Sequence, residues 1–187
     1  MNTPNQRPIG VFDSGVGGLT NVRALMERLP LENIVYFGDT ARVPYGVKSR
    51  ATIETFTAQI VGFMLEHDVK ALVIACNTIA AVAGHKVRQM AGNMPVLDVI
   101  SAGAQAALAT TRNNHIGVIA TNTTVNSNAY AREIHRRNPA ARVQSQACPR
   151  REAAGRGSGA GSADSSPPSR PRPATSPRRS PPSTPGS

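Results

Sequence analysis

The sequence has no tryptophan, only two cysteines and no uninterrupted apolar run of about 18 residues. Two distant cysteines cannot build a disulfide scaffold, so we expect a reduced, cytoplasmic protein. The missing apolar run argues against a membrane-spanning helix, and the first residues lack the basic head and apolar stretch of a secretory signal. The histidines show no metal-binding spacing to one another or to cysteine, so we expect no metal ion.

Apolar side chains are also missing from the end of the chain. Residues 150–187 contain no Val, Ile, Leu, Met, Phe, Tyr, Trp or Cys, and they hold seven Arg against Glu152 and Asp164. Such a segment has nothing to bury that would offset its conformational entropy, so we expect a disordered tail. Its arginines would attract phosphates, but no aromatic side chain is available to stack on bases, and a nucleic-acid partner is not expected.

What remains, residues 1–149, alternates short apolar runs with amphipathic segments. The apolar runs predict strands at 9–12, 34–37, 71–75, 95–97, 116–119 and 143–147. Helical periodicity or composition predicts helices at 22–29, 53–64 (capped by Ser49), 78–90, 102–109 and 125–137. This order of strands and helices indicates an α/β fold with a doubly wound parallel sheet.

Ligands bind such sheets at the carboxyl ends of the strands. The rule selects four places in this chain: Asp13-Ser14, Gly38-Asp39 with Pro44-Tyr45-Gly46, Cys76-Asn77-Thr78, and Thr121 to Thr124.

Cys76 lies between a predicted strand and a predicted helix, where unpaired amides and the positive helix end favour a thiolate. We therefore expect a lowered thiol pKa, although a buried cysteine acting as a small apolar residue is the alternative. If the first and third strands are neighbours, Asp13 faces Cys76 and can exchange a proton with it or orient it. The alternative role for Asp13 is an Asx-turn or a helix cap.

The loops beside these residues suggest supporting roles. Gly15, Gly17 and Gly18 permit a tight turn, without the pattern of a nucleotide-binding loop. Tyr45 could cover a cleft and donate a hydrogen bond, or it could be a turn residue. The polar residues Asp39, Thr40 and Arg42 are expected to structure their loop, and Cys148 is interpreted as structural or adventitious.

Four segments together resemble the aspartate/glutamate racemase family. They are IGVFDSGVGGLT at 9–20, YFGDTARVPYG at 36–46, ACNT at 75–78 and ATNTTV at 120–125. The resemblance covers about residues 8–149 and none of the tail. It implies two α/β domains that face each other across a cleft, which here would be 1–97, without its C-terminal return segment, and an incomplete 98–149.

The resemblance also implies an activity, the cofactor-independent interconversion of L- and D-glutamate that supplies peptidoglycan. In the family one cysteine removes the α-proton and a second returns a proton on the opposite face. Cys76 matches the first catalytic cysteine, and Asp13 matches the carboxylate that assists it. The positions that match substrate-binding residues are Asp13, Ser14, Tyr45, Gly46, Asn77, Thr78, Thr121 and Thr124. A homodimer is a further family expectation for a full-length chain.

One family element is absent, the Gly-Cys-Thr-His block that carries the second cysteine. Cys148 does not stand in that context, because the chain turns at Pro149 into an Arg/Pro/Ser/Gly/Ala mixture. We hypothesise a reading-frame change or truncation near this point and expect impaired activity. The alternatives are an inactive racemase fragment and a racemase of another acidic amino acid, such as aspartate.

Overall fold

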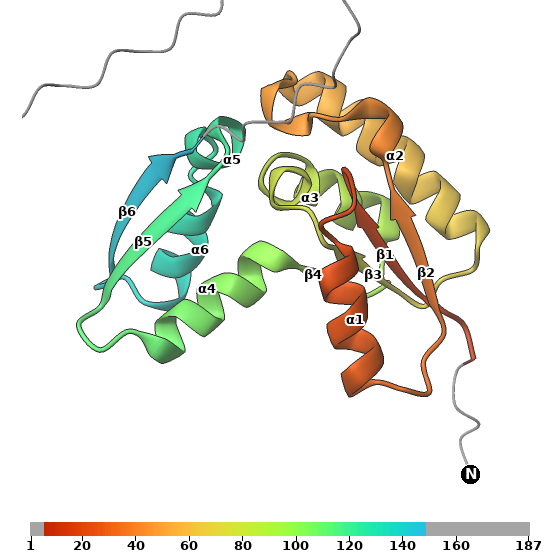
Figure 1. Ribbon diagram of the computed structural model, residues 1–187, viewed down its shortest axis with the longest axis horizontal. Coiled ribbons are helices and arrows are strands. Elements are labelled where there is room, and N and C mark those ends of the chain that lie inside the picture. The colour runs from red at the N-terminus through yellow and green to blue at the C-terminus, as the bar shows by residue number, and fades with distance from the viewer. Residues whose placement is uncertain (1–5, 149–187) are drawn as a thin grey trace, which may run out of the picture. The chain divides into compact units, whose positions relative to one another are not determined.

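The computed structural model describes residues 6–148, so the tail expected at 150–187 lies outside the described residues. Along the chain (Figure 1) the elements are β1 (Ile9–Asp13), α1 (Leu19–Arg28), β2 (Ile34–Gly38), the 3-10 turns η1 (Thr40–Arg42) and η2 (Tyr45–Val47), α2 (Arg50–Glu66), β3 (Ala71–Ile74), α3 (Asn77–Ala91), β4 (Val96–Asp98), α4 (Val99–Thr110), β5 (His115–Ala120), α5 (Asn122–Asn126), α6 (Ala129–Arg137) and β6 (Arg142–Ala147).

The first four strands form one parallel sheet in the order β2-β1-β3-β4. Ile9 at the start of β1 is paired with Ile34 of β2 on one side and with Ala71 of β3 on the other. This register places the carboxyl ends of the three strands at the same edge of the sheet, so the segments that follow Asp13, Gly38 and Ile74 are brought together. The predicted doubly wound α/β sheet is confirmed.

Both faces of this sheet are covered because neighbouring strand residues point in opposite directions. Phe12 of β1 is fully buried in a cluster with side chains of α2 and α3, whereas Val11 packs with Val22 and Leu25 of α1. Figure 1 shows α1 on one side of the sheet and the other two helices on the opposite side.

The start of α2 agrees with the sequence. Ser49 is its N-cap residue, and the Ser49 hydroxyl accepts a hydrogen bond of 3.2 Å from the Thr52 amide. Ile53, Ile60 and Met64 of this helix are buried against the sheet. The cap sets where α2 begins, and the buried apolar residues hold the helix against the sheet. Together they fix the end of the loop that connects β2 to α2.

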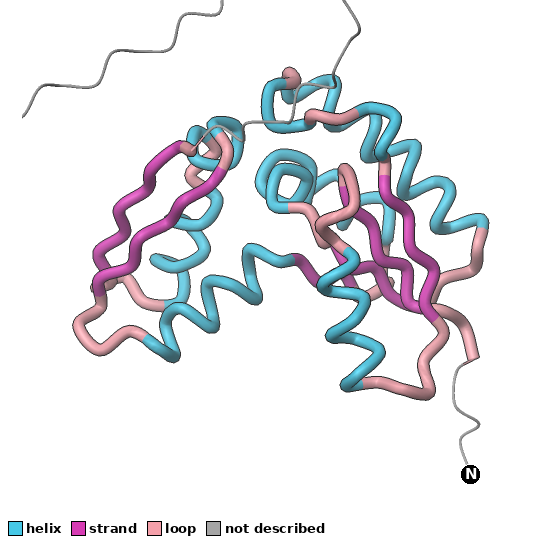
Figure 2. The backbone as a smooth tube through the Cα atoms, viewed as in Figure 1, coloured by secondary structure: helices cyan, strands magenta, loops and turns pink. Residues whose placement is uncertain are grey.

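A second, two-stranded parallel sheet is formed by β5 and β6 (Figure 2). Ala104 of α4, Ile134 of α6 and Ala141 form a small buried cluster with apolar side chains of these strands. The other face of β5 is open, since Ile119 is 76% exposed. The predicted domain boundary at residue 97 stays a prediction.

Two helix predictions need correction. The helix expected at 125–137 is two helices, α5 and α6, because Asn128 adopts a left-handed conformation with φ of 54° and interrupts the hydrogen-bond ladder. In α1, only part of the predicted apolar face is covered: Met26 is 60% exposed, and Leu29 lies beyond the last helical residue.

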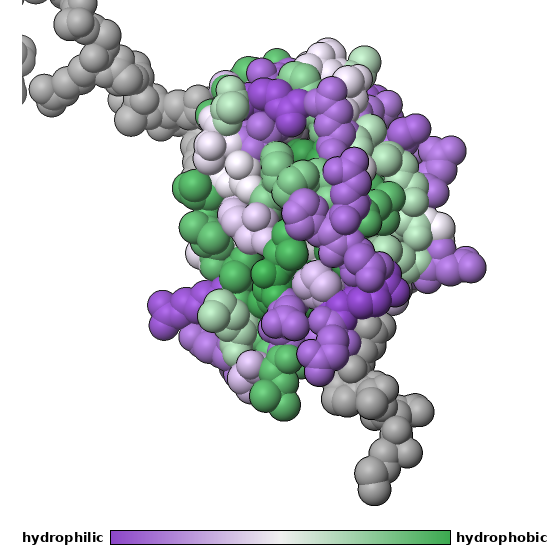
Figure 3. Space-filling model, turned by 90° about the vertical axis from the view of Figure 1, so that its right-hand side faces the viewer, coloured by the Kyte–Doolittle hydropathy of each residue, from purple (hydrophilic) through white to green (hydrophobic). Residues whose placement is uncertain are grey.

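Some apolar surface is therefore open to solvent. Figure 3 shows hydrophobic surface lying between hydrophilic residues on one face of the molecule. Near α1 the exposed apolar residues are Val16, Leu19, Met26, Leu29 and Leu31. Within residues 6–148, no helix combines the length and the apolar character needed to cross a bilayer.

Candidate active site

Asp13 ends β1 and organises the loop that follows it. One carboxylate oxygen accepts a 2.7 Å hydrogen bond from the Ser14 amide, and the other accepts a 2.7 Å bond from the Gly18 amide just before α1. A Cβ at position 18 would lie 2.8 Å from the Asp13 Cβ, so this close approach requires glycine. Asp13 therefore has the loop-forming role, and its side chain can also lie near Cys76.

Cys76 occupies the N-cap position of α3, separated from the end of β3 by Ala75 alone. The Ser14 Oγ lies 3.2 Å from the Cys76 Sγ and 3.4 Å from a carboxylate oxygen of Asp13. The neighbouring positions of β1 and β3 bring these three residues together, as the strand-end rule predicts. The thiol itself is buried, with 6% of the residue exposed.

The expected lowering of the Cys76 pKa is wrong. Burial raises the pKa of the Cys76 thiol, and the negative charge of Asp13 raises it further. Hydrogen bonds from the Ser14 hydroxyl and from the backbone amides of Ile79 and Ser14 lower it, but they do not outweigh the loss of water. The sequence shows the helix start and cannot show how completely the sulfur is desolvated.

Tyr36 is a further member of the site that the sequence pattern did not reveal. From β2, its hydroxyl donates a 2.9 Å hydrogen bond to the carbonyl of Gly15. Burial raises the pKa of Tyr36 to about 12, with contributions from the charges of Asp13 and Cys76, so the hydroxyl stays protonated. Because Tyr36 stands inside an apolar strand, its only sequence signal is one hydroxyl in a buried run.

Tyr45 lies in the loop after β2 and is 2% exposed. Its hydroxyl donates to Asp39, and the Arg42 Nε lies 2.7 Å from the same carboxylate oxygen. Burial and this hydrogen bond raise the pKa of Tyr45. The predicted loop-structuring role of Asp39 and Arg42 is confirmed, and the side chain of Tyr45 belongs to that network.

Hydroxyl groups connect this loop and α3 to the segment after β5. The Thr78 Oγ1 lies 3.4 Å from the Thr121 Oγ1, which lies 3.1 Å from the Thr124 Oγ1. The Thr123 hydroxyl donates to the carbonyl of Gly46, and a Cβ on Gly46 would lie 3.1 Å from the Cβ of Thr121. A larger residue than glycine would therefore push these segments apart.

Asn77, the first residue of α3, is exposed, and within residues 6–148 its side chain has one hydrogen-bond partner. The Tyr130 hydroxyl of α6 donates a 2.7 Å hydrogen bond to the Asn77 Oδ1. Tyr130 was not identified from the sequence, since no motif connects residues that far apart. The contact joins α6 to the end of the central sheet where Cys76 lies.

The structure places the sequence-predicted site residues in two contact groups. Asp13 and Cys76 both contact Ser14, and Thr78, Thr121 and Thr124 are joined through their hydroxyls, with Gly46 beside Thr121. Tyr45 is bound to Asp39, and Asn77 to Tyr130. Together the predicted residues offer a buried thiol, a carboxylate, hydroxyls and a carboxamide, which suits proton transfer on a polar ligand. Within residues 6–148, no three His, Cys, Asp or Glu side chains gather to hold a metal ion.

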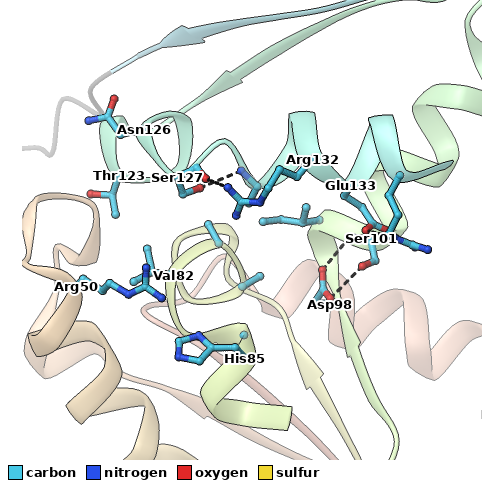
Figure 4. Close-up of a pocket in the computed structure, with 16 residues that line it drawn as sticks. Arg50, Val82, His85, Asp98, Ser101, Thr123, Asn126, Ser127, Arg132 and Glu133 are labelled. Atoms are coloured by element: carbon cyan, nitrogen blue, oxygen red, sulfur yellow. Dashed lines mark hydrogen bonds and ion pairs between the residues drawn. The ribbon is translucent and has the colours of Figure 1, made fainter. Parts of the chain in front are cut away.

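A cavity of about 820 Å³ lies elsewhere, lined by residues of α3, α4, α5 and α6 and by Arg50 (Figure 4). Its charged groups are largely engaged: Glu133 pairs with Arg136, and Asp98 accepts from Ser101 and pairs with Arg88. Thr123, from the predicted segment after β5, lines this cavity, whereas Asp13, Ser14 and Cys76 do not, so its volume does not mark the thiol site.

Known proteins are similar to this chain in sequence. The chain is 80% identical over 148 residues to a glutamate racemase of Neisseria meningitidis serogroup C, covering 79% of this chain and 55% of that protein. It is 64% identical over 147 residues to a glutamate racemase of Syntrophus aciditrophicus, covering 79% of this chain and 54% of that protein. The chain thus spans about half the length of these relatives.

A solved structure is similar to this chain in both fold and sequence. The glutamate racemase of Francisella tularensis in complex with D-glutamate matches with a TM-score of 0.73 and 55% identity, over 77% of this chain and 54% of that one. The family model for Asp/Glu/Hydantoin racemase matches residues 20–163. The chain therefore belongs to the Asp/Glu/Hydantoin racemase family.

Proposed function

We propose that the site is one half of the active site of an enzyme that interconverts L- and D-glutamate without a cofactor, with Cys76 as one of the two groups that transfer the α-proton. The observation that carries this proposal is the contact of the buried Cys76 thiol with Ser14, beside the Asp13 carboxylate. We choose glutamate as the substrate because the similar proteins are named glutamate racemases and one of them was solved in complex with D-glutamate.

A path for the thiol proton runs through Ser14. The Cys76 S–H can donate to the Ser14 hydroxyl, while that hydroxyl donates to Asp13. Passing the proton along this path turns the thiol into a thiolate and the carboxylate into a carboxylic acid. The thiolate then takes the α-proton of the substrate, and the same atoms run the step in reverse.

We assign substrate binding to donors at the strand ends. The Asn77 amide, the hydroxyls of Ser14 and Thr78 and the N-terminal end of α3 can hold carboxylates. Because the Tyr45 hydroxyl is already bound to Asp39, Tyr45 and Gly46 would contact a ligand through the backbone. Thr121 and Thr124 would support Thr78 through their hydroxyl chain.

Inversion needs a second proton-transfer group on the opposite face of the Cα. Cys148 is exposed at the end of β6, where its amide donates to the carbonyl of Ala120. We do not assign Cys148 this role. The proposal for this chain is therefore proton exchange by Cys76 on one face, with inversion impaired.

The cellular setting forms part of the same proposal. A glutamate racemase of this kind would work in the cytoplasm and supply D-glutamate for peptidoglycan. A full-length chain would form a homodimer.

Deuterium exchange tests the proposal. The chain is incubated with D- or L-glutamate in D2O, and loss of the α-proton signal is followed by NMR while optical rotation reports inversion. We expect exchange of one enantiomer, lost in Cys76→Ala and retained in the control Cys148→Ala. No exchange with either enantiomer would contradict the proposal, and faster exchange of aspartate would assign the site to that substrate instead.

A further inference from the structure

Tyr130 and Asn77 form a contact that has no role in the proton path. The phenol oxygen of Tyr130, near the start of α6, lies 2.7 Å from the Oδ1 of Asn77, the first residue of α3. A carboxamide offers an accepting oxygen and two N–H donors. This hydrogen bond therefore decides which end of the Asn77 side chain is left for a ligand.

The Tyr130 hydroxyl is held in place as a donor. Its ring lies against Gly103 of α4, where a Cβ would be 3.2 Å from the hydroxyl oxygen and 3.3 Å from the ring atom Cε1. Burial raises the pKa of Tyr130, and the charge of Asp98 raises it further, so the hydroxyl stays protonated at neutral pH. In the structure this protonated phenol donates its proton to the carboxamide oxygen of Asn77.

The nitrogen of the same carboxamide is left available. Among residues 6–148 the structure gives the Asn77 Nδ2 no acceptor, and the residue is exposed. We propose that Tyr130 is a positioning residue that binds the Asn77 oxygen and so presents the Asn77 NH2 group to a substrate carboxylate. The inference rests on the proposed function, since it names the part of that site that selects an anionic group.

The opposite orientation would weaken the site. A rotated carboxamide would point its oxygen at the carboxylate, replacing an attractive contact with a repulsive one. It would also make the Tyr130 oxygen accept from the NH2 group, so the phenol proton would lose its acceptor on Asn77. Loss of the hydroxyl should therefore weaken binding rather than remove the proton path at Cys76.

NMR of the full chain, labelled with 15N at asparagine, tests the orientation directly. The side-chain signals of Asn77 are assigned by their loss in Asn77→Asp. In Tyr130→Phe we expect these signals to shift, while Thr110→Val, which removes an exposed hydroxyl from α4, leaves them in place. Titration with D-glutamate then gives dissociation constants, which we expect to rise about three- to tenfold in Tyr130→Phe, the range for one lost hydrogen bond.

Asn77→Asp adds an independent arm, because its carboxylate can still accept from Tyr130 and has no donor for a ligand. We expect it to bind D-glutamate far more weakly than Tyr130→Phe. Unmoved Asn77 signals in Tyr130→Phe, or unchanged affinity despite a shift, would overturn the positioning role. If the signals shift but the unaltered chain does not bind glutamate, the proposed function fails while the orientation by Tyr130 stands.

Discussion

The Ser14 Oγ lies 3.2 Å from the Cys76 Sγ, although the two residues are 62 positions apart in the sequence. The contact depends on the parallel pairing of β1 with β3, which places the residues after both strands at one edge of the sheet. It gives the buried thiol a hydroxyl partner that also reaches Asp13. The reactivity of Cys76 therefore depends on the loop after β1, which is distant from it in the sequence.

Replacing Ser14 by alanine should make Cys76 harder to ionise. The Ser14 hydroxyl lowers the thiol pKa, which burial and Asp13 raise, so its loss leaves only the amide hydrogen bonds to oppose them. At a fixed pH below the thiol pKa we expect Cys76 to react with iodoacetamide about two- to tenfold more slowly in Ser14→Ala. Peptide mass spectrometry across a pH series measures this.

Cys148 provides an internal control for that experiment, because it is exposed and lies at the end of another strand. Its alkylation profile should be the same in both proteins. Equal profiles for Cys76 with and without the serine hydroxyl would mean that the contact with Ser14 does not affect the thiol.

Two glycine substitutions should have opposite effects on stability. Gly18→Ala places a Cβ 2.8 Å from the Asp13 Cβ and 3.0 Å from the Ala75 Cβ, and we expect a loss of about 1–3 kcal/mol in the free energy of unfolding. Gly62, inside α2, has no atom within 4 Å of the added carbon, so Gly62→Ala should gain about 0.5–1 kcal/mol from helix propensity. Urea unfolding measures both, and a neutral Gly18→Ala would refute the close packing of this loop.

Hydrophobic periodicity was enough to predict the sheet and the strand ends at which Asp13, Cys76 and Thr121 lie. It could not predict the break between α5 and α6, because that break depends on one left-handed residue, Asn128, within a run of good helical spacing. The pattern also placed Met26 on the apolar face of its helix, and Met26 is 60% exposed. Local periodicity reports which residues share a face and does not report how much of that face is covered.

The candidate site was predictable in its strand-end residues and not in its supporting ones. Tyr36 and Tyr130 act across 21 and 53 positions of sequence, and each has only a single hydroxyl to signal its role. The predicted direction of the Cys76 pKa shift was wrong for a related reason. The helix start is visible in the sequence, whereas burial, which dominates the shift, is a property of the packed structure.

Glu133 should make stability depend on pH in an acidic window. Hydrogen bonds from Arg136, and then from Arg137, lower the pKa of Glu133 from 4.5 to about 2. A carboxylate with a lowered folded pKa stabilises the fold above its unfolded pKa and loses that contribution as pH falls from about 4.5 to 2. Because Arg136 is largely exposed, we expect at most about 1 kcal/mol. Urea midpoints at several pH values should show a smaller decline in Glu133→Gln; an identical decline would contradict this role.

Tyr45→Phe tests whether the loop after β2 is held by its buried polar network. The change leaves the ring in place against Phe56 but removes the hydroxyl that donates to Asp39, a residue only 4% exposed. Arg42 remains as a partner of that carboxylate, so we expect a loss of about 1–3 kcal/mol rather than unfolding. Hydrogen exchange should speed up at the amides of Arg42 and Lys48, which close the two turns of this loop, while the Ser49 cap of α2 keeps the helix amides protected. Uniform acceleration over the whole chain would show instead that Tyr45 supports global stability and not this loop in particular.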